Sequence, residues 1–116
     1  MSTIDDVQKL IDEQVKGNPI IIYLKGTPER PMCGFSARAV DVLKSFDVPF
    51  AAVNVLENEG IRQGIKQYAN WPTIPQIYID GKFIGGCDIL VEMKDSGELE
   101  PMLRQAAEKF EFDKAE

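Results

Sequence analysis

One stretch, residues 20–46, constrains the fold more than any other part of the chain. It begins with a fully apolar run, Ile20–Leu24, continues through a loop rich in Pro and Gly, and passes after Cys33 into apolar residues at helical spacing. A continuous apolar run of this length is typical of a strand buried on both faces, whereas the Pro and Gly residues exclude a helix or a central strand. The stretch therefore predicts a strand, a loop and a helix, with Cys33 where the loop meets the helix.

Cys33 thus occupies a position that favours a reactive thiolate. The N-terminus of a helix carries free N–H groups and a partial positive charge, and both stabilise a thiolate. A cysteine so placed can have its pKa lowered from about 8.5 to between roughly 3.5 and 7.5, and Lys25 and Arg38 could add positive charge nearby. The alternative for any free cysteine is an unreactive side chain buried in the core, but the position of Cys33 between loop and helix argues against it. Ser36 stands where a C-x-x-C pair has its resolving thiol, so Cys33 must act with one thiol.

The rest of the chain alternates helical and strand patterns. Asp80-Gly81 between two apolar runs is a strong hairpin signal, and the helix between the first two strands makes those strands parallel. The sequence predicts an α/β, thioredoxin-like fold, with a small four-stranded mixed sheet between helices, in a single domain spanning residues 1–116. The predicted helices are 4–15 with Thr3 as N-cap, 33–46, 59–68, one capped by Asp88 that runs through Met93, and 99–110; the strands are 20–24, 50–55, 76–79 and 82–84; residues 111–116 are expected to fray.

Composition and charge exclude several classes of protein. The 116 residues are enough to bury a core without disulfides or metals. A formal net charge of −6 without a basic stripe argues against a nucleic-acid partner. No apolar run approaches the roughly 20 residues of a membrane span, and the acidic N-terminus lacks the features of a secretory signal or transit peptide. Two cysteines fit a reducing compartment, so we expect a cytoplasmic protein without membrane partners.

Four motifs occur together along about residues 4–110. They are Lys25-Gly26-Thr27-Pro28, Cys33-Gly34-Phe35-Ser36, Trp71-Pro72-Thr73-Ile74-Pro75 and Gly85-Gly86-Cys87-Asp88. In this order and spacing they resemble the motifs of monothiol glutaredoxins of the C-G-F-S type, in the short form without an added thioredoxin domain. C-G-F-S alone would be a weak match, but the four motifs together are highly specific.

The resemblance implies that glutathione binds beside Cys33, through charges at its two ends and backbone groups in between. Each charged residue also has a plainer interpretation: a solvated lysine at a strand end, a solvated arginine on a helix face, or an aspartate that caps a helix. Ile74, where some relatives have an aromatic residue, would act through its backbone beside Pro75, which is cis in this fold. The implied glutathione residues are Lys25, Arg62, Ile74, Cys87 and Asp88, with Cys33 as the reactive thiol.

Two functions stay open at this point. Iron–sulfur clusters usually need four thiolate-type ligands, and one chain with two cysteines and no histidine cannot supply them. The resemblance implies a homodimer in which Cys33 of each chain and two glutathione thiolates bind a [2Fe-2S] cluster. The dimer would store the cluster or transfer it to apo iron–sulfur acceptor proteins, in cluster assembly and iron homeostasis. The resemblance also implies a BolA-type protein as a further partner. The alternative is an oxidoreductase whose Cys33 removes glutathione from protein mixed disulfides; the missing resolving cysteine and a 25–33 loop longer than in dithiol glutaredoxins count against it.

Overall fold

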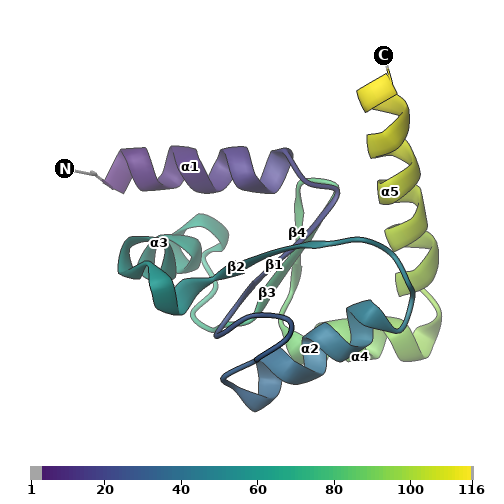
Figure 1. The fold of residues 1–116 in the computed structure, drawn as a ribbon, viewed down its shortest axis with the longest axis horizontal. Helices are drawn as coiled ribbons and strands as arrows, with labels where there is room; N and C mark the ends of the chain where they lie inside the picture. The colour runs from purple at the N-terminus through teal and green to yellow at the C-terminus, as the bar shows by residue number, and fades with distance from the viewer. Residues whose placement is uncertain (1–3, 116) are drawn as a thin grey trace.

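The computed structural model describes residues 4–115, with side chains described as far as Glu111. Figure 1 shows the chain starting with one helix and ending with another, on either side of a central sheet. The helices are α1 (Ile4–Lys16), α2 (Gly34–Lys44), α3 (Glu59–Ala69), α4 (Cys87–Ser96) and α5 (Leu99–Ala115), with a 3₁₀ turn η1 (Val55–Glu57); the strands are β1 (Ile20–Leu24), β2 (Ala51–Asn54), β3 (Gln76–Ile79) and β4 (Lys82–Gly85).

The four strands form one mixed sheet in the order β2-β1-β3-β4. β1 is parallel to β2 and antiparallel to β3, and β3 pairs with β4 as an antiparallel hairpin. Asp80 and Gly81 form the turn of this hairpin with φ values of 53° and 76°, as the Asp-Gly pair predicts. The α/β, thioredoxin-like fold with a four-stranded mixed sheet is therefore confirmed.

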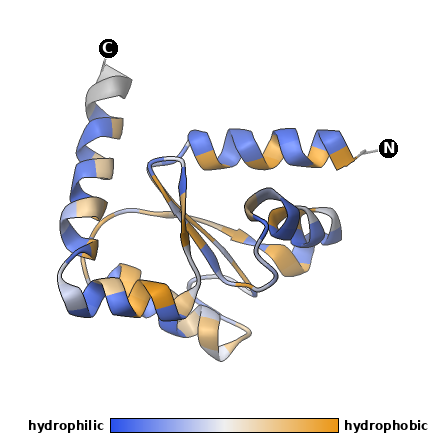
Figure 2. Ribbon diagram, turned by 180° about the vertical axis from the view of Figure 1, so that it is seen from behind, coloured by the Kyte–Doolittle hydropathy of each residue, from blue (hydrophilic) through white to orange (hydrophobic). Residues whose placement is uncertain are grey.

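Strand β1 is the centre of the core because it is buried on both faces. Successive side chains of a strand point to opposite faces. Ile20, Ile22 and Leu24 pack into the cluster formed with α2, α4 and α5, whereas Ile21 and Tyr23 pack into the cluster formed with α1 and α3. Figure 2 shows the corresponding division in α1, whose hydrophobic side faces α3 and whose outer side is hydrophilic. The apolar run predicted to be a two-sided strand therefore has this role.

Two boundaries near the loop and the second strand differ slightly from prediction. Helix α2 begins at Gly34, with Cys33 as its N-cap, and ends at Lys44 instead of residue 46. The predicted strand 50–55 is shorter, because the Asn54 side chain accepts the N–H of Leu56 at 3.0 Å and turns the chain into η1. Asn54 thereby places the end of β2 next to the loop that follows β1.

The predictions for the chain ends and for α4 have mixed outcomes. Gly86, and not Asp88, is the N-cap of α4, so the predicted capping role of Asp88 is wrong. Helix α5 continues to Ala115, through most of the segment 111–116 that was expected to fray. Thr3, the predicted cap of the first helix, lies outside the described residues. Among the helices of residues 4–115, none has the length and apolar character needed to span a membrane.

Candidate functional site

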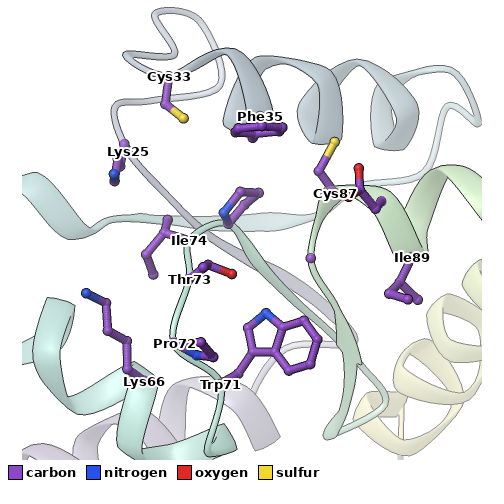
Figure 3. Close-up of a pocket in the computed structure, with 13 residues that line it drawn as sticks. Lys25, Cys33, Phe35, Lys66, Trp71, Pro72, Thr73, Ile74, Cys87 and Ile89 are labelled. Carbon is purple, nitrogen blue, oxygen red and sulfur yellow. The ribbon is translucent and has the colours of Figure 1, made fainter.

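A cavity of about 550 Å³ lies between the end of β1, the N-terminal ends of α2 and α4, and the segment that precedes β3 (Figure 3). Five of the six residues predicted from the sequence line it: Lys25, Cys33, Ile74, Cys87 and Asp88. The wall is completed by residues that sequence reasoning had not assigned to the site: Phe35, Lys66, Trp71, Pro72, Thr73, Pro75, Gly86 and Ile89. The fold thus gathers three distant segments of the chain around one thiol.

Cys33 is the N-cap of α2, with φ −152° and ψ 137°. The backbone N–H of Ser36 lowers the pKa of the Cys33 thiol most strongly, and the N–H of Phe35, the charge of Lys25 and the Ser36 hydroxyl act in the same direction, against the effect of partial burial. These donors are the free N–H groups of a helix start, as expected for a stabilised thiolate. Arg38, which was expected to help, acts instead on Cys87, whose pKa its charge lowers.

Ser36 has a structural task of its own in the C-G-F-S motif. Its side chain is fully buried, and its hydroxyl oxygen accepts the backbone N–H of Lys25 at 3.1 Å. This bond ties the end of β1 to the first turn of α2, so the two groups that flank Cys33 are held together. A buried hydroxyl in this place supports the thiolate, whereas it offers no second thiol for disulfide chemistry.

The loop between β1 and α2 is folded back on itself. The N–H of Met32 donates to the carbonyl of Lys25 at 2.8 Å, and Thr27 and Arg30 exchange backbone hydrogen bonds of 3.1 and 3.2 Å. Gly26 has φ 97°, and its N–H donates to the Asn54 side chain at 3.0 Å. The loop is therefore a closed turn, anchored to the end of β2, that leads the chain to Cys33.

The segment 71–75 forms the wall across the cavity from Cys33, as Figure 3 shows for Trp71, Pro72 and Thr73. The Ile74–Pro75 peptide bond is cis, as the resemblance implied. The Ile74 side chain is buried, whereas Pro72 and Thr73 are exposed. The backbone of this segment is thus available at the cavity, independently of the Ile74 side chain.

The N-terminus of α4 forms the third wall. Its first helical hydrogen bond runs from the N–H of Leu90 to the carbonyl of Gly86 at 3.1 Å, and the Gly86 cap contributes no side chain. The N–H groups of Cys87 and Asp88 precede this bond and have no partner within the helix. A Cβ at position 86 would lie 3.3 Å from the Pro75 carbonyl oxygen, so glycine permits the close approach of α4 to the cis-proline segment. The exposed Asp88 carboxylate stands beside these donors.

The two cysteines of the cavity differ in chemical state. Both are free thiols. Burial raises the pKa of the Cys87 thiol, and the Asp88 carboxylate and Cys33 add to this effect. The pKa of Cys33 is lowered and that of Cys87 is raised, so Cys33 is the more readily deprotonated of the two thiols. Cys87 therefore serves the site chiefly through its backbone and its packing.

Arg62 is the predicted site residue that does not line the cavity. One guanidinium nitrogen of Arg62 lies 4.0 Å from the Glu59 carboxylate. The Nε atom of Arg62 is buried and has no hydrogen-bond partner in the described part of the chain. Lys66, one turn further along α3, lines the cavity instead. Positions i and i+4 share a helix face, so the prediction of Arg62 contained the signal that could have identified Lys66.

The chain is similar to several known proteins. The family model described as Glutaredoxin matches residues 20–84. A protein named Glutaredoxin 4 from Pasteurella multocida is 49% identical over 110 residues, covering 95% of this chain and 97% of its own length. Monothiol glutaredoxin-S7, chloroplastic, from Oryza sativa subsp. japonica is 48% identical over 101 residues, covering 87% of this chain and 60% of its own length.

A solved structure matches as well. The solution structure of reduced poplar apo GrxS14 superimposes with a TM-score of 0.76 at 48% sequence identity, covering 88% of this chain and 94% of the poplar chain. The similarity extends over nearly all of the poplar structure, so it includes the sheet and the helices that carry the cavity.

Proposed function

The chain belongs to the glutaredoxin family, and we propose that it binds glutathione and carries a [2Fe-2S] cluster as its cargo. A homodimer would store the cluster or pass it to apo iron–sulfur proteins, in cluster assembly and iron homeostasis. The observation that carries this proposal is the placement of Cys33: a helix N-terminus favours its thiolate, and the resolving position holds the buried Ser36.

The cavity has the groups that glutathione requires. This tripeptide has a carboxylate at each end, an ammonium group at one end and a thiol in the middle. Figure 3 shows the cations of Lys25 and Lys66 on one side of the cavity and Cys87 on the other. The cations suit the glycine carboxylate, the free N–H groups of α4 suit the γ-glutamyl carboxylate, and Asp88 suits the ammonium group. Arg62 stays a proposed contact, one turn before Lys66.

Ligand number supports a dimer. The chain has two cysteines and no histidine, and only Cys33 combines partial exposure with a lowered pKa. Among the side chains that the structure describes, residues 4–111, no three His, Cys, Asp or Glu side chains gather as a metal site. Two copies of Cys33 and two glutathione thiolates would complete the four ligands of a cluster. Since half of the ligands are then a dissociable small molecule, the cluster can be released to acceptors.

A second candidate activity is favoured by the same lowered pKa. The Cys33 thiolate could attack the glutathione sulfur of a protein mixed disulfide, forming a Cys33–glutathione disulfide and releasing the protein thiolate. A glutathione thiolate would then attack this disulfide, regenerate the Cys33 thiolate and leave as oxidised glutathione. We give this oxidoreductase activity second place, because the 25–33 loop is longer than in dithiol glutaredoxins and because Ser36 provides no resolving thiol, so that turnover would depend on a second glutathione alone.

The remaining parts of the proposal rest on the resemblance. We propose a cytoplasmic location, consistent with two free cysteines. We also propose a BolA-type protein as a partner, which could replace one subunit and supply the histidine that this chain lacks.

Anaerobic assembly with iron, sulfide and glutathione tests the proposal. We expect a coloured dimer with two irons and two glutathiones per two chains, and release of the cluster when glutathione is removed. Cys33→Ser should abolish iron binding, whereas Cys87→Ala, the matched control in the same cavity, should retain most of it. An equal loss of iron in both variants, or brisk turnover of glutathione mixed disulfides by a protein that holds no iron, would overturn the carrier proposal.

A further inference from the structure

We propose that Gln76 is a positioning residue whose buried amide holds the segment 71–74 in the form that receives glutathione. The proposal rests on the proposed function for the identity of the ligand. Gln76 is the first residue of β3, it has no exposed surface, and it does not line the cavity. Any influence on a ligand must therefore pass through the groups to which it is bonded.

The Gln76 amide makes hydrogen bonds in both directions. Its Nε2 atom donates to the carbonyl of Trp71 at 3.1 Å and to the carbonyl of Thr73 at 3.2 Å. Its Oε1 atom accepts the hydroxyl of Tyr78 at 2.8 Å. Because a side-chain amide has two N–H donors, this arrangement uses both on carbonyls of the cavity wall. One side chain thus fixes two peptide groups that lie two residues apart in the wall.

Tyr78 completes the hydrogen bonds of this amide, whose orientation is set by the two carbonyls, since they can only accept. The Nε2 atom must face the two carbonyls, so the oxygen of the amide is left to accept the tyrosine hydroxyl. A reversed amide would place its oxygen against carbonyl oxygens, which is unfavourable in a buried site. The pair Tyr78 and Gln76 therefore forms a chain of hydrogen bonds from the core of the sheet to the cavity wall.

The aromatic packing of the same region provides a second connection. The Trp71 ring lies 5.4 Å from the Phe83 ring, and Phe83 lies 5.4 Å from the Tyr78 ring, measured between centroids. Removal of the Tyr78 hydroxyl alone would keep this packing. The effect of the hydrogen bonds can therefore be separated from the effect of the apolar contacts.

The test uses three variants of the full chain and glutathione as the probe. Gln76→Met keeps the length of the side chain and removes both donors. Tyr78→Phe removes only the hydroxyl that donates to the amide oxygen. Tyr23→Phe is the matched control, because Tyr23 is equally buried and contacts the Tyr78 ring, but its hydroxyl donates to Gln14 on α1 at 2.7 Å.

We expect glutathione binding, measured by calorimetry, to weaken roughly tenfold in Gln76→Met, as for the loss of one well-placed hydrogen bond. Tyr78→Phe should show a smaller loss and Tyr23→Phe none. Trp71 is the only tryptophan of the chain, so its fluorescence reports on the wall itself. Its emission should shift to the red in Gln76→Met and stay unchanged in Tyr23→Phe. The alkylation rate of Cys33 should not change, because the N–H groups that chiefly lower its pKa belong to α2.

The outcomes separate this inference from the proposed function. If the wild-type protein does not bind glutathione, the proposed function fails, and the Trp71 emission and the hydrogen exchange of the Trp71, Thr73 and Ile74 amides still decide the role of Gln76. If the wild type binds but Gln76→Met binds equally well, the inference is wrong. Equal losses of affinity in Tyr78→Phe and Tyr23→Phe would also overturn it, because they would reflect stability alone. Should Gln76→Met not fold, the two tyrosine variants give the answer.

Discussion

Replacement of Gly26 by alanine should destabilise the fold by way of the loop that leads to Cys33. A Cβ at position 26 would lie 2.4 Å from the carbonyl oxygen of Arg30 and 2.7 Å from the backbone nitrogen of Met32, and the φ of 97° is itself unfavourable for a residue with a side chain. Both neighbours are backbone atoms within the hydrogen-bonded turn. The substitution can be accommodated only if this turn opens.

The size of the effect follows from these contacts. The backbone conformation alone costs on the order of 1–3 kcal/mol, and each hydrogen bond lost from the turn adds about 1 kcal/mol. We therefore expect the free energy of unfolding to fall by roughly 2–5 kcal/mol, out of the about 5–15 kcal/mol typical of a domain. Gly34→Ala is the matched control, because a Cβ at that position meets no atom within 4 Å, and alanine should leave the stability unchanged or raise it by up to about 1 kcal/mol.

Urea unfolding followed by circular dichroism measures both variants. A second measurement, the pH dependence of Cys33 alkylation, should give a midpoint close to wild type for Gly26→Ala, because the N–H groups of Ser36 and Phe35 that chiefly lower the pKa of Cys33 belong to α2. Equal stabilities of the Gly26→Ala and Gly34→Ala proteins would show that the turn is not held closed in solution, and the reasoning would then be wrong.

Two further predictions concern the thiols and Asp88. Alkylation followed by mass spectrometry should give a lower pH midpoint for Cys33 than for Cys87, because the pKa of Cys33 is lowered from the ordinary thiol value and that of Cys87 is raised. Since the folded pKa of Cys33 is lowered, its contribution to stability is present above the unfolded pKa and is lost as the pH falls through the folded pKa. A reversed order of midpoints would contradict the assignment of the thiolate. Asp88→Ala should weaken glutathione binding by about 1.5–3 kcal/mol through loss of a charge-assisted bond, yet change the stability by less than about 1 kcal/mol, because Gly86 is the cap. Glu92→Ala, an exposed acidic residue one turn further along α4, should leave calorimetric affinity unchanged, and an equal loss there would assign the effect of Asp88 to net charge.

The elements that the sequence predicted well are those with strong local signals. The apolar run at β1 had to be a buried strand, and the Asp80-Gly81 pair had to be a hairpin turn, since each pattern has one common structural solution. The position of Cys33 followed from the contrast between the loop and the helix on either side. Five site residues then came together because the fold brings the end of β1 and the start of α4 to the same cavity.

The features that sequence reasoning missed depend on contacts between distant segments. Asp88 is a common capping residue, but the chain had already turned into the helix at Gly86. Arg62 and Lys66 share one face of α3, so the choice between them depends on which turn of α3 lies at the cavity, and periodicity does not specify this. Gln76 looked like an ordinary strand residue, and only the structure shows its amide between two carbonyls of the cavity wall.

Two helix N-termini, those of α2 and α4, meet at one cavity in a protein whose formal net charge is −6. An anionic tripeptide that approaches from solution would first meet a repulsive field, and it would meet attraction only within the cavity. At physiological salt the Debye length is about 8 Å, so salt would weaken the outer repulsion more than the inner contacts and would speed entry. The same acidic exterior would favour docking proteins with basic surfaces. The choice of protein partners and the capture of the small ligand would then depend on charges of opposite sign on one small domain.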